Sequence, residues 1–235
     1  MSAVPLETTA DVWNALCPVV DSPQLGPRDV VSSGCAELDE RLVRNGVAKG
    51  ALLESLGAGD GAGAAFLAVN AARNALADGG ALVVVDVQDS FYPSAAVRFG
   101  IASERMLIVR PSTEREALWA CEQALRSAGV AAVLCWPEYL TPLAFRRLQL
   151  AAEEGGTLGL LVRSTRAQHE PSWADVRWLV SPAPSEAGRR RFSVDVLRGQ
   201  SRRDGALLLE ADDEGALCMV SRLADSAPAG SERRA

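Results

Sequence analysis

Residues 51–64 read ALLESLGAGDGAGA, and this stretch decides the fold class. Its first half, residues 51–56, is a short apolar run of strand length, and its second half is a glycine-rich turn. Residues 64–77, which follow, are alanine-rich and stop before Gly79 and Gly80, as a helix does. A strand, a glycine-rich turn and a helix in this order point backbone N–H groups at an anion, so the stretch predicts a phosphate-binding type of loop.

The chain beyond this loop alternates between apolar runs and helical patterns. Apolar runs predict strands at residues 81–86, 106–109, 130–135 and 157–162, and helical patterns lie at residues 93–99, 113–127 and 141–156. Thr113 and Thr141 are the expected N-caps of the last two helices. Strands that are apolar throughout, each followed by a helix, indicate an α/β fold with a mostly parallel sheet covered on both faces. Strand-like runs at residues 176–180, 192–197 and 206–209 are joined by turns and predict an antiparallel C-terminal edge. We expect an N-terminal helix and linker at 1–28, a core domain at 29–224 and a disordered tail at 225–235.

The composition limits the classes of function. The chain has 235 residues, is 48% hydrophobic and 23% charged, and carries a net charge of −6. These values suit one globular domain, and the negative charge argues against strong DNA binding by the domain alone. No apolar run reaches the roughly 20 residues that span a bilayer, and the N-terminus lacks a signal-peptide pattern, so we expect a cytoplasmic protein without a membrane segment. Five scattered cysteines and a single histidine, His169, favour reduced thiols and no metal site.

The glycine-rich loop lacks the residues that handle ATP. A working loop reads G-x-x-x-x-G-K-[ST], in which the lysine contacts the β- and γ-phosphates and the hydroxyl binds Mg²⁺. The second glycine is replaced by Ala62, the lysine by Gly63 and the hydroxyl residue by Ala64, and Lys49 is the only lysine in the chain. Two interpretations stay open, namely a loop that keeps some affinity for anions and a connector that only allows close packing, and we favour the second. The vestigial loop comprises Gly57, Gly59, Asp60, Gly61, Ala62, Gly63 and Ala64, of which Asp60 adds a negative charge.

Four segments in the same order resemble the RecA family. They are residues 30–39 (VVSSGCAELD), residues 50–54 (GALLE) with the loop at Gly57, residues 85–88 (VDVQ) and residues 133–136 (VLCW). The resemblance implies a RecA-like core, and it places Gln88 at the glutamate that activates water and Trp136 at the metal-binding aspartate of the Walker B strand. Neither residue supplies a carboxylate, so we expect a pseudo-ATPase without catalytic residues, cofactor or metal. Residues 137–140 and 163–171, at the positions of the two DNA-binding loops of RecA, are short, so DNA binding is expected to be weak or absent.

A RecA-like chain of this length with degenerate Walker motifs is similar to the ImuA family, also labelled SulA-like. That resemblance implies a non-catalytic accessory protein of SOS-induced translesion synthesis. Its implied partners are ImuB, a catalytically inactive relative of Y-family polymerases, and RecA, with an error-prone DnaE-type polymerase contacted indirectly. The alternatives are a divergent RecA-like ATPase, a DNA-binding module and a SulA-like inhibitor of cell division.

If the chain has no catalytic activity, it must act by binding other molecules through its surface. Trp13 and Leu16, in the expected N-terminal helix, are candidates for self-association or for docking on RecA, unless that helix folds onto its own core. Trp136 is expected either to fill the vacated nucleotide pocket or to anchor a partner. An arginine-rich stretch is a candidate for an acidic partner or a DNA backbone, unless it only solvates turns; it comprises Arg189, Arg190, Arg191, Arg198, Arg202 and Arg203.

Overall fold

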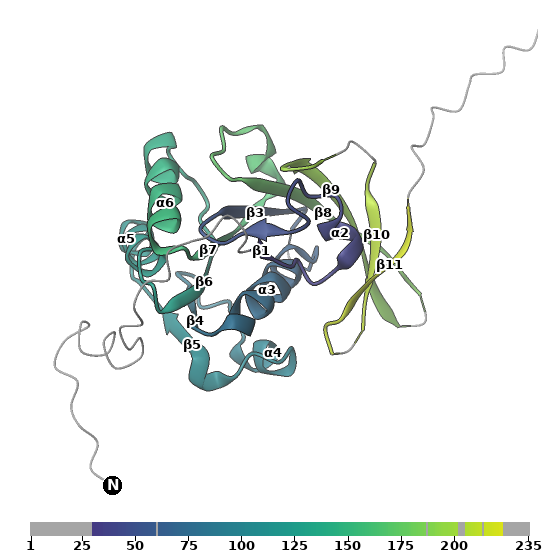
Figure 1. Cartoon of the computed structure of the whole chain (residues 1–235), viewed down its shortest axis with the longest axis horizontal. Coiled ribbons are helices and arrows are strands. Elements are labelled where there is room, and N and C mark those ends of the chain that lie inside the picture. The colour runs from purple at the N-terminus through teal and green to yellow at the C-terminus, as the bar shows by residue number, and fades with distance from the viewer. Residues whose placement is uncertain (1–29, 60, 187, 202–204, 213, 223–235) are drawn as a thin grey trace, which may run out of the picture.

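The structure is a computed structural model that describes residues 30–59, 61–186, 188–201, 205–212 and 214–222 (Figure 1). The expected N-terminal helix with Trp13 and Leu16 lies outside these residues. So do the expected C-terminal tail, Asp60 in the loop, and Arg202 and Arg203 of the arginine-rich stretch.

The described residues form a nine-stranded sheet with the order β11-β10-β9-β8-β3-β7-β6-β4-β5 and a separate two-stranded sheet. The parallel part has the predicted strands, and it confirms the α/β fold class. The bounds of these five strands are β3 (Leu52–Gly57), β4 (Ala81–Val85), β5 (Met106–Val109), β6 (Val130–Cys135) and β7 (Leu158–Ser164).

The C-terminal edge is antiparallel, as predicted, with one difference. Its strands are β8 (Val176–Glu186), β9 (Arg189–Arg198), β10 (Leu207–Ala211) and β11 (Leu217–Arg222). β8 joins the two parts of the sheet, because it pairs parallel with β3 on one side and antiparallel with β9 on the other. The sequence did not indicate the parallel pairing of β8 with β3, and β11 was not predicted.

Helices cover both faces of the parallel sheet (Figure 1). α3 (Ala64–Ala75) and α4 (Pro93–Arg98) lie on one face, where Leu53, Leu82 and Leu160 meet α3 in a buried cluster. α5 (Glu114–Leu125) and α6 (Pro142–Gly155) lie on the other face, over Leu52 and Leu161. The shorter elements are β1 (Val30–Val31), α2 (Ala36–Asp39), β2 (Val47–Ala48), η1 (Leu76–Asp78), η2 (Ser103–Arg105) and η3 (Thr165–His169).

The predicted capping residues set the helix starts on the second face. The Thr113 hydroxyl accepts from the Glu116 N–H at 3.2 Å, and the Glu116 carboxylate accepts in return from the Ser112 N–H at 2.9 Å. The Thr141 hydroxyl caps α6 in the same way, ahead of Pro142 at the first helical position. These side chains satisfy N–H groups that have no partner inside the helix. None of the helices in the described ranges is long and apolar enough to cross a membrane.

Candidate functional site

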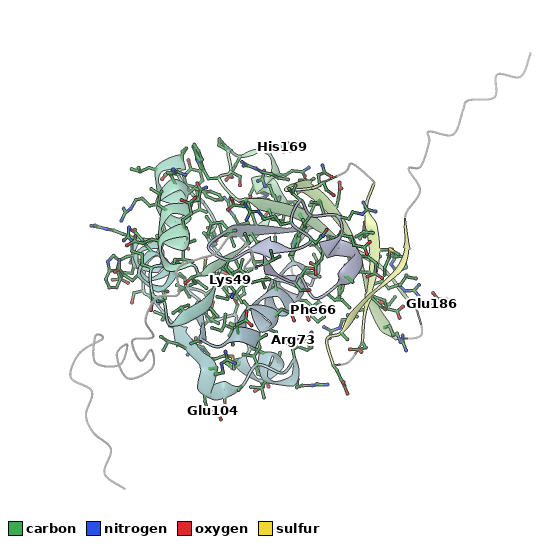
Figure 2. All side chains as sticks on the ribbon, in the orientation of Figure 1. Lys49, Phe66, Arg73, Glu104, His169 and Glu186 are labelled. Atoms are coloured by element: carbon green, nitrogen blue, oxygen red, sulfur yellow. The ribbon has the colours of Figure 1, made fainter. Side chains whose placement is uncertain are left out.

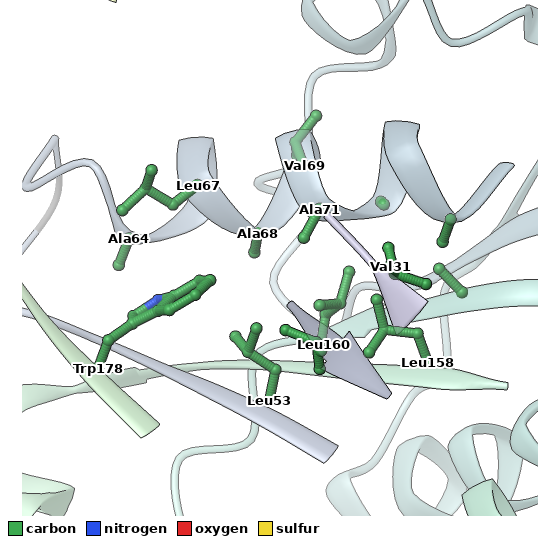
Figure 3. Packing of buried hydrophobic residues seen from close by; sticks show 14 of the residues in the cluster. Val31, Leu53, Ala64, Leu67, Ala68, Val69, Ala71, Leu158, Leu160 and Trp178 are labelled. Atoms are coloured by element: carbon green, nitrogen blue, oxygen red, sulfur yellow. The ribbon is translucent and has the colours of Figure 1, made fainter. Parts of the chain in front are cut away.

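The base of the glycine-rich loop rests on a buried tryptophan. Trp178 of β8 is fully buried and lies beneath the first turns of α3, next to Ala64 and Ala68 (Figure 3). Its Nε1 donates to the Ser55 hydroxyl at 2.7 Å, and that hydroxyl donates to the Ala64 carbonyl at 3.0 Å. The strand, the loop and the helix start are therefore held together by polar contacts that use no bound anion.

The lysine position of the loop is closed by an aromatic ring. Gly63 is the N-cap of α3 and has a φ of +94°, a conformation that strains any residue with a side chain. A Cβ atom at Gly63 would lie 2.5 Å from Cδ1 of Phe192, a buried residue of β9. A lysine at this position would therefore collide with the ring before its side chain could extend towards a phosphate.

Phe192 belongs to a row of aromatic rings that joins α3 to its surroundings. Its ring centroid lies 5.4 Å from that of Phe66 on α3, and Phe66 in turn stands nearly perpendicular to Phe99, with centroids 5.2 Å apart. Figure 2 labels Phe66, which lies between α3 and the antiparallel strands. Such ring pairs stabilise a fold by about 0.5–1.5 kcal/mol each beyond their burial. Packing on Phe66 therefore helps to hold the Phe192 ring against Gly63.

The outer part of the loop differs from its inner corner. Gly57, Ala62 and Ala64 are buried, whereas Gly59 and Gly61 are exposed, and no described atom would lie within 4 Å of a Cβ at either exposed glycine. The outer rim is thus open to solvent, while the corner where lysine and hydroxyl groups would act is filled by Phe192.

The other two vestigial positions lie at the ends of neighbouring strands. Gln88 is exposed, and its amide donates to the Glu138 carboxylate at 3.3 Å. Trp136 is half-buried and packs on Phe91, with ring centroids 6.1 Å apart. The ring that lies against Gly63 is therefore that of Phe192. The sequence pointed only to Trp136, because nothing in a strand-like run at 192–197 indicates which loop it will cover.

A shallow hollow beside Trp136 faces α5. Cys121, Cys135 and Glu114 line it together with apolar side chains. Partial burial raises the pKa of Glu114, and the nearby charge of Glu138 raises it further. Within the described ranges, no cluster of three or more His, Cys, Asp or Glu side chains is suited to hold a metal ion.

A buried charge network lies on the sheet below the loops that follow β6 and β7. Glu54 of β3 is fully buried, and one carboxylate oxygen accepts from Nη1 of Arg163 at 2.8 Å. The other oxygen lies 2.6 Å from Nε of Arg177, without the alignment of a hydrogen bond, and accepts from the Ser172 hydroxyl at 2.9 Å. Two arginines thus compensate one buried carboxylate.

The same arginines fix the two short loops. Arg163 donates to the carbonyls of Pro137 and Glu138, which follow β6, and pairs with Glu170 at 2.6 Å. Arg177 donates to two carbonyls of η3, which follows β7. Both loops at the positions of the RecA DNA-binding loops are therefore anchored to the core through Glu54.

The arginine-rich stretch is partly neutralised within the fold. Arg189 and Arg191 each lie 2.8 Å from Glu210 of β10, and Arg191 also pairs with Glu186. Hydrogen bonds to Glu210 raise the pKa of both arginines. Arg198 donates to the Ser172 carbonyl at 2.8 Å, and Arg190 is exposed. The described members of this stretch therefore do not form one basic patch.

Comparison with known proteins identifies the family. Residues 21–141 match the RecA N-terminal domain family. The ImuA proteins of two Caulobacter vibrioides strains, NA1000 / CB15N and ATCC 19089 / CB 15, are each 32% identical to the chain over 231 residues, covering 88% of it and 95% of their own length. The chain belongs to the ImuA family of RecA-like proteins. The ImuA match extends over nearly twice as much of the chain as the match to RecA of Rhodopirellula baltica, which is 29% identical over 45% of the chain and 28% of that RecA.

A solved structure agrees with this assignment at the level of the fold. The crystal structure of the RadB recombinase superposes with a TM-score of 0.61, at 16% identity, and the match covers 81% of this ImuA-family chain and all of RadB. At this identity the likeness describes the RecA-like architecture alone, so the function has to be argued from the site.

Proposed function

We propose that this ImuA-family chain is a non-catalytic accessory protein of SOS mutagenesis that acts through protein contacts. The observation that carries the proposal is the Phe192 ring against Gly63, at the position where a RecA-like ATPase has its lysine. Phosphoryl transfer depends on cations and metal ligands placed around the phosphates. Gly63, Ala64 and Trp136 supply none of them.

The anchored loops support a role other than RecA-type DNA binding. Loops that bind DNA in the RecA manner must be free to reorganise. The loops after β6 and β7 are instead hydrogen-bonded to Arg163 and Arg177, which pair with the buried Glu54. The net charge of −6 also disfavours binding to a polyanion. Protein surfaces are then the means by which this chain acts.

The partners we propose are those that the family resemblance implies. They are an ImuB-like relative of Y-family polymerases and RecA, with a DnaE-type polymerase joining through the first. Acting inside the cell on DNA-bound polymerases, the chain would serve as a scaffold and not as a motor.

The test is direct capture with purified proteins. The full chain, immobilised through one terminus, is exposed to an ImuB-like protein and to RecA, each with and without ATP·Mg²⁺. We expect saturable binding of at least one partner, with the same affinity with and without ATP·Mg²⁺. The Phe192→Ala variant, which lacks the ring against Gly63, is measured in the same way to show whether nucleotide alters the binding. Failure to capture either partner, or binding that requires ATP on this chain, would contradict the proposal.

A further inference from the structure

The outer surface of α5 and α6 carries apolar side chains that no described element covers. Leu143 and Leu150 of α6 are 72% and 44% exposed, Trp119 of α5 is 59% exposed, and Trp173, after η3, is 44% exposed. The Arg146 guanidinium lies 5.6 Å from the Trp173 ring centre, in cation–π contact. We call this surface the α5–α6 face, comprising Trp119, Leu143, Arg146, Leu150 and Trp173.

An ion pair links α5 to α6 close to these side chains. Glu122 of α5 pairs with Arg147 of α6 at 2.5 Å, which sets the register of the two helices. Trp119 and Leu143 each lie one turn before that pair, and Leu150 lies almost one turn after it. Single exposed apolar residues are common, but a contiguous group of this kind indicates a surface that binds something.

The described chain begins with β1, which packs against α3 and pairs with β2, and β2 leads to the end of α6. Val30 of β1 pairs with Ala48 of β2. Gly50 comes two residues after Ala48 and lies against the end of α6. A Cβ at Gly50 would lie 3.1 Å from the Ala152 carbonyl oxygen and 3.5 Å from Cα of Gly156. The 14-residue α6 is about 21 Å long. Since an extended chain spans about 3.3 Å per residue, residues 18–29 can span about 40 Å, nearly twice the length of α6, before residue 17 is reached.

The residues before Val30 complement the face in both apolarity and charge. Residues 12–20 include Val12, Trp13, Leu16 and Val19 in a helix-like spacing. Residues 1–27 hold three acidic residues, Glu7, Asp11 and Asp21, and no lysine or arginine. The α5–α6 face presents the exposed cation of Arg146, and Arg115 lies exposed on α5.

We propose that residues 7–21 of the same chain dock on the α5–α6 face, with Trp13 and Leu16 against Trp119, Leu143 and Leu150. The acidic residues that flank the apolar stretch would then meet the arginines at the rim. The segment can reach this face within one chain because β2, with which β1 pairs, leads directly to the end of α6.

Cys17, which lies inside the proposed segment, provides a natural probe. In the full chain carrying Leu150→Cys and Cys218→Ser, a short bismaleimide should link residues 17 and 150 of one molecule. Cys35, Cys121 and Cys135 are buried and should not compete. The matched control is Val97→Cys in α4, which is 47% exposed on the other face of the sheet. We expect the link to residue 150 to form at least tenfold faster than the link to residue 97, and peptide mass spectrometry identifies both.

Two results would overturn this cis contact. One is equal cross-linking at residues 150 and 97, which would show that the segment has no preferred site. The other is a cross-linked dimer in place of the intrachain product, which would assign the face to a second copy of the chain.

Hydrogen exchange gives an independent readout without introduced cysteines. Amides of residues 10–20 should exchange at least tenfold more slowly in the wild-type chain than in the Trp119→Glu, Leu143→Glu variant, because charges on the face displace the apolar segment. Val97→Glu serves as the control and should leave the slow exchange unchanged. Fast exchange in the wild type, or slow exchange that persists in the double variant, would contradict the proposal.

Discussion

At Gly63, a single residue determines what the loop can do. A RecA-like ATPase needs a lysine there, but the backbone has a φ of +94° and the ring of Phe192 lies where the side chain would begin. The sequence alone identified the missing lysine. It did not identify the ring, because Phe192 is distant in the sequence and comes close only when β9 folds over the start of α3.

We therefore expect Gly63→Ala to lower the free energy of unfolding by about 2–4 kcal/mol, from backbone strain and from collision with Phe192. The control is Gly61→Ala, where φ is +78° and no described atom lies within 4 Å of the new Cβ. That change should cost only the strain, about 1–2 kcal/mol. Urea unfolding measures both variants. Equal losses at the two glycines would show that the ring does not restrict position 63.

A second prediction concerns Glu54, whose side chain is fully buried between Arg163 and Arg177. Glu54→Gln removes the carboxylate that pairs with Arg177 and leaves Arg163 with only the partly exposed Glu170, so it should lower the free energy of unfolding by about 3–5 kcal/mol. Glu170→Gln is the control, since Glu170 is one-third exposed and pairs with Arg163 alone; it should cost about 1 kcal/mol or less. If both variants unfold at the same urea concentration, Glu54 does not organise the network.

Among the elements, the parallel strands and capped helices followed from local pattern. The runs at 106–109 and 130–135 have the bounds of β5 and β6, because the first lies between Arg105 and Arg110 and the second between Gly129 and Trp136-Pro137. Thr113 and Thr141 marked the starts of α5 and α6, since a capping hydroxyl acts on N–H groups only three residues away.

The bounds of the antiparallel strands were harder to predict from the sequence, for a physical reason. The predicted strand ended at Val180, and Pro182 and Pro184, which cannot donate to a sheet, follow it. In the structure β8 continues to Glu186, but its pairing with β3 ends at Val180, and among the described strands only β9 accompanies it further. Proline is tolerated in a strand at positions where the backbone N–H would face an unpaired edge. The pairing of Glu54 with two distant arginines was invisible for a related reason, since it depends on tertiary contacts.

At the antiparallel edge, Glu210 of β10 gives a pH dependence. Hydrogen bonds from Arg189 and then Arg191 lower the pKa of Glu210 in the folded state. Its contribution to stability is therefore present above the ordinary glutamate pKa, about 4.5, and is lost as the pH falls through the lowered value. Glu210→Gln should flatten the pH dependence of the unfolding midpoint below about pH 4.5 and leave its slope at neutral pH unchanged. Thermal unfolding monitored from pH 2 to 8 measures this. An unchanged acid slope in the variant would mean that the two arginines do not stabilise the carboxylate.

On the scale of the whole molecule, the anchored loops and the net charge of −6 predict weak or absent DNA binding. A labelled single-stranded oligonucleotide should show no saturable change in anisotropy at low micromolar protein and about 50 mM salt, a concentration at which phosphate contacts are strong. Loss of any residual binding in Arg190→Glu would assign it to the exposed arginine. Saturable binding that weakens steeply with salt would instead place this chain among DNA-binding modules.

We infer that the RecA-like architecture persists here without a working nucleotide site, and isothermal titration of the full chain with ATP·Mg²⁺ can show whether this is so. Phe192→Ala is titrated in parallel, because removing the ring opens the corner but restores neither lysine nor hydroxyl. We predict no saturable heat for either protein up to millimolar nucleotide, under conditions in which a RecA control binds. One-to-one binding by the wild-type chain with a micromolar Kd would contradict the account.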